Sequence, residues 1–95
     1  MHLDITGHHI EVTDALREYV SDRASKIEHH FDTVLDVHFT LTVDKTEHIA
    51  EATACVPGKR LHAKSIDTNM YAAIDSLYEK LNRRVRKHKE RIKRH

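Results

Sequence analysis

The chain has 95 residues, 39% of them hydrophobic and 33% charged, and its formal net charge is +1. This length and composition predict one small globular domain, residues 1–95, and exclude a membrane helix because no apolar run approaches about 18 residues. The single cysteine, Cys55, excludes an internal disulfide and a multi-cysteine zinc site. No basic segment precedes an apolar stretch at the N-terminus, so no secretory signal is indicated and we expect a cytoplasmic protein.

The N-terminal third predicts a strand followed by a helix. Residues 2–6 alternate polar and apolar side chains, which is typical of a half-buried strand, and Gly7 is expected to open a turn. Thr13 can cap a helix over about 13–30, with Asp14 in its first turn. The apolar residues of this helix recur at helical spacing: Leu16, Val20, Ile27 and Phe31.

The middle of the chain predicts three more strands. Residues 35–43 alternate with a period of two, so the odd positions should be buried. A turn at 44–48 leads to a second alternating run that buries small side chains up to Val56. Pro57-Gly58 suits a type II turn, and a fourth strand follows around 60–64.

The last segment predicts a long helix over 68–94, capped by Asp67 or Thr68. At about 1.5 Å per residue it would span about 40 Å and project beyond a compact core. Its apolar stripe consists of Met70, Ile74, Leu77, Leu81, Val85 and Ile92.

The expected element order is therefore β-α-β-β-β-α. Three consecutive strands with short connections predict an antiparallel meander, and the first helix can carry the first strand back beside a neighbour. We expect an α+β, two-layer sandwich, with a four-stranded sheet and both helices on one face.

Charge is distributed unevenly along the chain. Residues 80–95 contain nine Lys or Arg and one acid, Glu90, for a net charge of +8, whereas residues 1–79 carry −7. Such asymmetry indicates a polyanionic partner, although a basic helix end can also serve only solubility and the helix dipole.

A helical projection places part of this charge on one side of the last helix. Lys80, Arg84, Lys87 and Arg91, which we call the cationic flank, fall between about −20° and −80° from Leu77. Arg83 and Arg94 lie slightly beyond these angles, and the acids Asp75, Glu79 and Glu90 lie on the far side. On the first helix, Arg23, Lys26 and His30 form a similar but weaker set, and the two sets could face the same way.

Cations placed along helices in this way are typical of proteins that bind the phosphate backbone of a nucleic acid. No strand carries a pair of aromatic residues on its polar face, so the sequence disfavours readout by base stacking and favours structured RNA, with no DNA expected. A general structured-RNA-binding protein and a protein-directed regulator remain alternatives.

Catalytic and metal functions find little support. The ten histidines have no zinc-motif spacing, so we expect no metal site and no cofactor. A ribonuclease could use two histidines and a lysine, but no concave site is indicated. Cys55 is expected to be a packing residue. We therefore expect no enzyme and no catalytic residues.

Five stretches in order along the chain resemble the bacterial ribosome hibernation promoting factors and the related ribosome-associated translation inhibitors. They are Leu3–Gly7 (LDITG), Glu11–Val20 (EVTDALREYV), His62-Ala63, Asn69–Asp75 (NMYAAID) and Lys80–Lys89 (KLNRRVRKHK).

This resemblance implies a fold similar to a double-stranded-RNA-binding domain with an added strand. It also implies binding to 16S rRNA of the 30S subunit, in the channel for mRNA and tRNA, through cations of both helices. Carried over to this chain, these are Arg23, Lys26, Lys80, Arg83, Lys87 and Arg91, and the helical projection adds Arg84.

The resemblance is to the short form, because neither a C-terminal dimerising domain nor an acidic tail follows. It implies a translation silencer of stationary phase or stress that acts on 70S ribosomes and promotes 100S dimers together with a separate ribosome modulation factor. We expect no membrane partner and a monomer off the ribosome.

Overall fold

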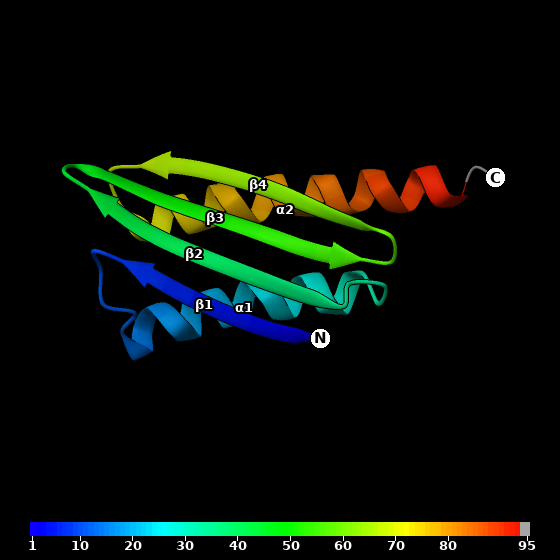
Figure 1. Cartoon of the computed structure of the whole chain (residues 1–95), viewed down its shortest axis with the longest axis horizontal. Coiled ribbons are helices and arrows are strands. Elements are labelled where there is room, and N and C mark those ends of the chain that lie inside the picture. The colour runs from blue at the N-terminus through cyan, green and yellow to red at the C-terminus, as the bar shows by residue number, and fades with distance from the viewer. Residues whose placement is uncertain (94–95) are drawn as a thin grey trace.

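The computed structural model describes the backbone of residues 1–93 and the side chains as far as Arg91, so the predicted positions Ile92 and Arg94 lie outside the described side chains. The predicted β-α-β-β-β-α order is confirmed (Figure 1). In chain order the elements are β1 (His2–His8), α1 (Asp14–His30), β2 (Asp36–Asp44), β3 (Glu47–Val56), β4 (Lys59–Asp67) and α2 (Met70–Lys93).

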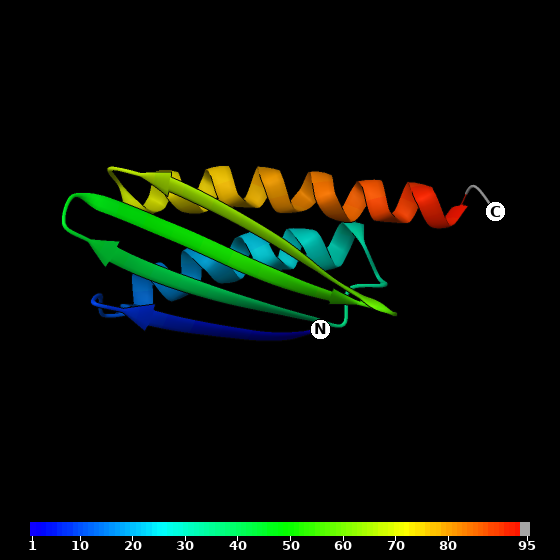
Figure 2. The ribbon, with the colours of Figure 1, turned by 45° about the horizontal axis from the view of Figure 1, so that its top comes forward.

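The four strands form one sheet in the order β1-β2-β3-β4. β1 runs parallel to β2, while β2, β3 and β4 form the expected antiparallel meander. A parallel pair needs a crossover connection, which α1 provides. Figure 2 shows both helices on the same side of the sheet, so the predicted two-layer α+β sandwich is confirmed.

Alternation places the core between the sheet and the helices. Phe39 and Leu41 of β2 are fully buried, opposite small side chains such as Ala50 and Ala52 of β3, which let a helix approach closely. The expectation that Leu35 is buried is wrong, since its side chain is 55% exposed. β2 begins only at Asp36, so Leu35 lies outside the alternating segment.

Local hydrogen bonds determine where the helices begin. The hydroxyl of Thr13 accepts a hydrogen bond from the amide of Leu16, as predicted. The predicted cap of α2 is wrong, because Asn69 rather than Asp67 or Thr68 accepts hydrogen bonds from the first free amides. Asp67 instead accepts from the amide of Thr68, which leaves it outside the helix.

One of the two predicted glycine turns is present in the structure, and the other is not. Gly58 has a φ of 78°, the left-handed value that the predicted type II turn requires. The predicted turn at Gly7 is wrong, because Gly7 belongs to β1 and the backbone turns at His9, with a φ of 59°. β4 is longer than predicted and buries Ser65.

Gly7 has a packing role instead. A Cβ atom there would lie 2.6 Å from the carbonyl oxygen of Ile10 and 2.9 Å from Cγ2 of Val12. Because the first contact is backbone, Gly7→Ala should lower the free energy of unfolding by about 1–3 kcal/mol in a urea titration. Gly58→Asn is the control, since nothing lies within 4 Å of a Cβ at that position and Asn tolerates left-handed φ. Equal stability of Gly7→Ala and wild type would contradict this packing.

No helix in the described part of the chain is long and apolar enough to cross a lipid bilayer.

Candidate nucleic-acid interface

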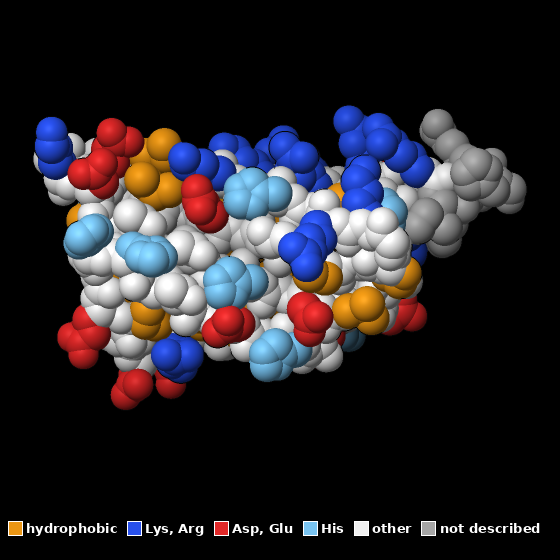
Figure 3. All heavy atoms as spheres, in the orientation of Figure 1, with side chains coloured by type: hydrophobic (Ala, Val, Ile, Leu, Met, Phe, Trp, Pro, Cys, Tyr) orange, Lys and Arg blue, Asp and Glu red, His pale blue; other side chains and the backbone are white. Residues whose placement is uncertain are grey.

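The C-terminal turns of α2 extend past the end of the sheet (Figure 1). Val85 is the last buried residue of α2 among the described side chains, and the four residues directly after it, Arg86 to Lys89, are all basic. All four members of the cationic flank are exposed. In Figure 3 the Lys and Arg side chains gather along the side of the molecule formed by α2.

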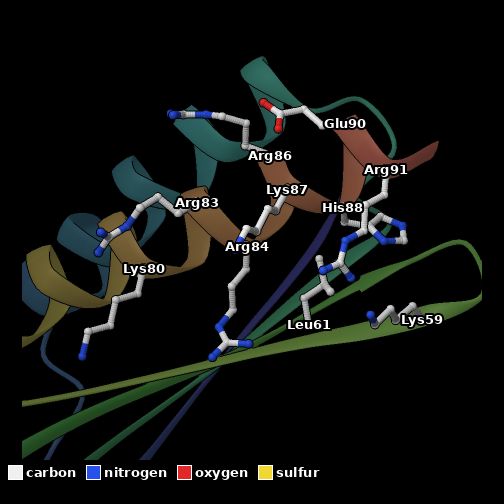
Figure 4. A pocket seen from close by; sticks show the side chains of 10 residues that line it. All are labelled: Lys59, Leu61, Lys80, Arg83, Arg84, Arg86, Lys87, His88, Glu90 and Arg91. Carbon is white, nitrogen blue, oxygen red and sulfur yellow. The ribbon is translucent and has the colours of Figure 1, made fainter. Parts of the chain in front are cut away.

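The cationic flank faces β4. Lys80 donates a hydrogen bond from Nζ to the carbonyl oxygen of Lys64 over 3.0 Å. Further along α2, Arg84 and Arg91 extend toward β4, whereas Arg86 and Glu90 project from the opposite side of the helix (Figure 4). Together these α2 side chains and two residues of β4 line an open hollow of about 680 Å³.

The cationic flank has no carboxylate partner in the part of the chain that the structure describes. Within the described residues, none of its four side chains forms an ion pair within 4.0 Å. By contrast, Lys64 on β4 lies 3.6 Å from the carboxylate of Glu51. The flank therefore presents positive charge that is free to meet an external anion.

The predicted site residues of α1 have a different environment. The guanidinium of Arg23 donates hydrogen bonds to Asp75 of α2 over 2.9 and 3.2 Å and to Asp22 over 2.8 Å. It also lies 3.9 Å from the ring centre of Tyr19. Lys26 is exposed, with Nζ 3.7 Å from Asp22.

Arg23 therefore does not face the same way as the cationic flank. Arg23 points toward α2, and on that flank of α2 Tyr71 packs edge-on against Tyr19. The cationic flank lies on the other side of α2, over β4. Arg83 donates from Nε to the carbonyl oxygen of Glu79 over 3.4 Å, and its guanidinium forms no other hydrogen bond with the residues that the structure describes.

The contact between α1 and α2 affects an ionisable group. The hydroxyl of Tyr19 donates to Oδ2 of Asp75 over 2.7 Å. This hydrogen bond, with a smaller effect of burial, raises the pKa of Tyr19 above its ordinary value of 10.0, because a phenolate would face the carboxylate. The stabilisation from this bond is therefore present below pH 10 and is lost as the pH rises through the higher folded-state pKa.

Asp75→Ala should move the titration midpoint of Tyr19 to lower pH. The ¹³Cζ chemical shift of Tyr19, followed by NMR between neutral and alkaline pH, measures this midpoint. Glu79→Ala, one turn further along α2 and also exposed, is the control and should leave the midpoint in place. An unchanged midpoint in Asp75→Ala would contradict the assignment of the shift to this hydrogen bond.

The histidines do not gather into a metal-binding cluster among the described residues. Two of them form hydrogen bonds on the exposed face of the sheet, where Nδ1 of His38 lies 2.9 Å from Asp4 and Nδ1 of His62 lies 3.1 Å from Thr53.

Comparison with known proteins identifies the family. The sequence profile described as "Sigma 54 modulation protein / S30EA ribosomal protein" matches residues 3–93. The chain belongs to this family. The family resemblance predicted from the five sequence stretches is thereby confirmed.

Members of the family align along the whole chain. The ribosome hibernation promoting factors of Salmonella typhimurium and of Escherichia coli K12 are each 44% identical over 95 residues, which is 100% of both chains. That of Azotobacter vinelandii is 45% identical over 91 residues, covering 96% of this chain and 85% of its own.

Solved structures of two similar proteins share the fold. A ribosomal subunit interface protein from Coxiella burnetii has a TM-score of 0.89 at 28% identity, covering 95% of this chain and 99% of its own. The N-terminal domain of Protein Y from Thermus thermophilus has a TM-score of 0.85 at 27% identity, covering 93% and 99%.

The sequence indicated the cations of α2 as a binding surface, and it predicted β4 as a strand but not as part of that surface. Lys59 and Leu61 of β4 line the same hollow as the cationic flank, and so does His88 of α2. Neither β4 residue stands out in the sequence, because only the pairing of β4 with β3 and the packing of α2 across the sheet bring them there.

Proposed function

We propose that this protein is a cytoplasmic ribosome hibernation factor that binds 16S rRNA of the small ribosomal subunit in the channel for mRNA and tRNA. Its action is steric and needs no catalysis, because a ligand seated in the channel excludes both mRNA and tRNA. The observation that carries the proposal is the row of exposed cations along α2, which form no ion pair within the described part of the chain. The names of similar proteins, which refer to ribosome hibernation and to the ribosomal subunit interface, support the ribosome as the partner.

The cationic flank suits a structured RNA. Its residues follow one another at three- and four-residue intervals, so their charges line one side of α2 over about three turns. A row of this length can meet successive phosphates of a folded RNA, and phosphate contacts supply most of the affinity of such complexes. The proposed RNA-binding residues are Lys80, Arg83, Arg84, Lys87 and Arg91, with Lys26 of α1 as an exposed peripheral contact.

Arg23 differs from the cations of α2 because its guanidinium is already paired. Its guanidinium already donates to two carboxylates, so a direct phosphate contact would have to compete with Asp75 and Asp22. We propose that Arg23 contributes by holding α1 against α2, and that any contact of this side chain with rRNA is made from that position.

The proposal is tested by sedimentation through sucrose with purified ribosomes. We expect the protein to pellet with 30S subunits and 70S ribosomes despite an excess of duplex RNA, and to be displaced by excess tRNA. Displacement by duplex RNA alone would instead favour a general structured-RNA-binding protein. Because the family description also mentions modulation of sigma 54, a complex from cell extract that survives ribonuclease would favour a protein-directed regulator.

We further propose that binding promotes or stabilises 100S ribosome dimers together with a ribosome modulation factor. Gradients of 70S ribosomes with either protein alone and with both separate this role from simple occupancy of the channel. A 100S peak that is no larger with both proteins than with the modulation factor alone would exclude it.

A further inference from the structure

The hollow lined by α2 and β4 is open to solvent and large enough to admit a small molecule. Its volume of about 680 Å³ falls within the range of about 300–1,000 Å³ typical of ligand pockets. Lys59 of β4 and Arg84 and Arg91 of α2 bring positive charge to it from two separate elements (Figure 4). An anion bound there would be held from both sides, unlike one resting on a single helix.

The charge around the hollow is almost entirely of one sign. Of the lining residues, Glu90 is the only acid, and it projects from the side of α2 away from β4 (Figure 4). Lys59, Arg84 and Arg91 form no ion pair within 4.0 Å among the described residues. Arg guanidinium groups and Lys ammonium groups gathered without carboxylates are the usual partners of phosphate.

Two further lining residues indicate that the ligand is more than a bare anion. Leu61, which is 7% exposed, contributes an apolar surface between the cations. His88 is half-buried, and its Nε2 atom is buried with no hydrogen-bond partner in the described structure. Nε2 is shielded from the hollow, so it is the remaining surface of this lining ring that can pack against a sugar or base.

We infer that this hollow binds one nucleoside phosphate, with the phosphate against Lys59, Arg84 and Arg91 and the sugar or base against Leu61 and His88. The same chemistry has two sources, a free nucleotide or one nucleotide of an RNA strand. In the second case the inference rests on the proposed function and adds β4 to its interface. One nucleotide needs only this single apolar surface, and not the row of aromatic side chains that the sequence lacks.

NMR on the full chain, labelled at leucine methyl groups and histidine rings, tests the inference. The probes are guanosine 5′-diphosphate, a short single-stranded RNA and inorganic pyrophosphate. We expect saturable shifts at Leu61 and His88 with the nucleotide or with the RNA, and much weaker effects with pyrophosphate. Shifts caused by the nucleotide would identify a free nucleotide as the ligand. Shifts caused by the RNA but not by the nucleotide would identify one nucleotide of an RNA strand as the ligand.

Lys59→Gln should weaken this binding about tenfold, since it removes one charge-assisted contact. Lys45→Gln is the matched control, because Lys45 is an exposed lysine in the turn at the other end of β3. Arg91→Gln provides a second variant and should match Lys59→Gln. The control should bind like wild type.

The inference is overturned if neither the nucleotide nor the RNA shifts the signals of Leu61 and His88. It is also overturned if pyrophosphate binds as tightly and causes the same shifts. A Lys45→Gln variant that binds as weakly as Lys59→Gln would overturn it as well. Ribosome sedimentation of the same samples separates this failure from that of the proposed function. Wild type that pellets with ribosomes while its hollow binds no probe refutes the nucleotide site alone.

Discussion

Arg84→Gln/Lys87→Gln should release the protein from ribosomes at a salt concentration where wild type stays bound. Both side chains belong to the cationic flank, are exposed and lack a carboxylate partner among the described residues. Each lost phosphate contact should weaken binding about tenfold, so the double variant should bind about a hundredfold more weakly. Each should also flatten the dependence of log K on log salt by roughly one unit. Quantitative sedimentation over a salt series measures both effects.

Arg17→Gln/Lys45→Gln is the matched control. It removes one arginine and one lysine, both exposed, from α1 and from the turn between β2 and β3. If position matters, this variant should bind nearly like wild type even though its net charge falls by the same amount. Equal losses in the two double variants would mean that the protein acts through bulk charge, and the assignment of the interface to α2 would have to be withdrawn.

Phe39→Asp should unfold the protein or come close to doing so. Phe39 has no exposed surface and lies in the middle of β2, under the helix layer. The substitution removes a large apolar contact and buries a carboxylate without a partner, which together should cost about 4 kcal/mol or more. Domains of this size are stable by only about 5–15 kcal/mol, so circular dichroism during thermal or urea unfolding should show a large loss.

Leu35→Asp makes the same kind of change at a position of the same parity, just before β2. Because Leu35 is 55% exposed, this variant should change the free energy of unfolding by less than about 1 kcal/mol. A Phe39→Asp variant that melted like wild type would refute the packing of β2. A Leu35→Asp variant as damaged as Phe39→Asp would refute the observed start of that strand.

The contrast between Phe39 and Leu35 also shows how far the sequence predicts the fold. Alternation with period two identified the buried face of β2 because one face meets the helices and the other meets water. It gave no sign of where the strand begins, since Leu35 continues the pattern. The cap at Asn69 was missed for a similar reason, because three neighbouring residues can all cap a helix and only the chain path selects one.

The candidate site was predictable where it depends on one helix. A projection of α2 from residue spacing alone groups Lys80, Arg84, Lys87 and Arg91, and the structure places them on one exposed flank. The projection gives no information on the contact between Arg23 and Asp75, which is 52 residues away in the sequence. It also does not predict that Lys59 and Arg91 line the same hollow. Contacts between elements depend on the sheet order and on which side of α1 the second helix packs.

The extension of α2 beyond the sheet has a kinetic consequence. The molecule measures 46 Å along its longest axis and 21 and 18 Å across, and the C-terminal turns of α2 lie at one end of that axis. The net charge is +8 on residues 80–95 and −7 on residues 1–79, so the positive charge is concentrated in the segment that contains the end of α2. In the field of a polyanion the protein should rotate before contact, so that the cations of α2 meet the partner first. Association should therefore be fast at low ionic strength and slow steeply with added salt, while dissociation changes less.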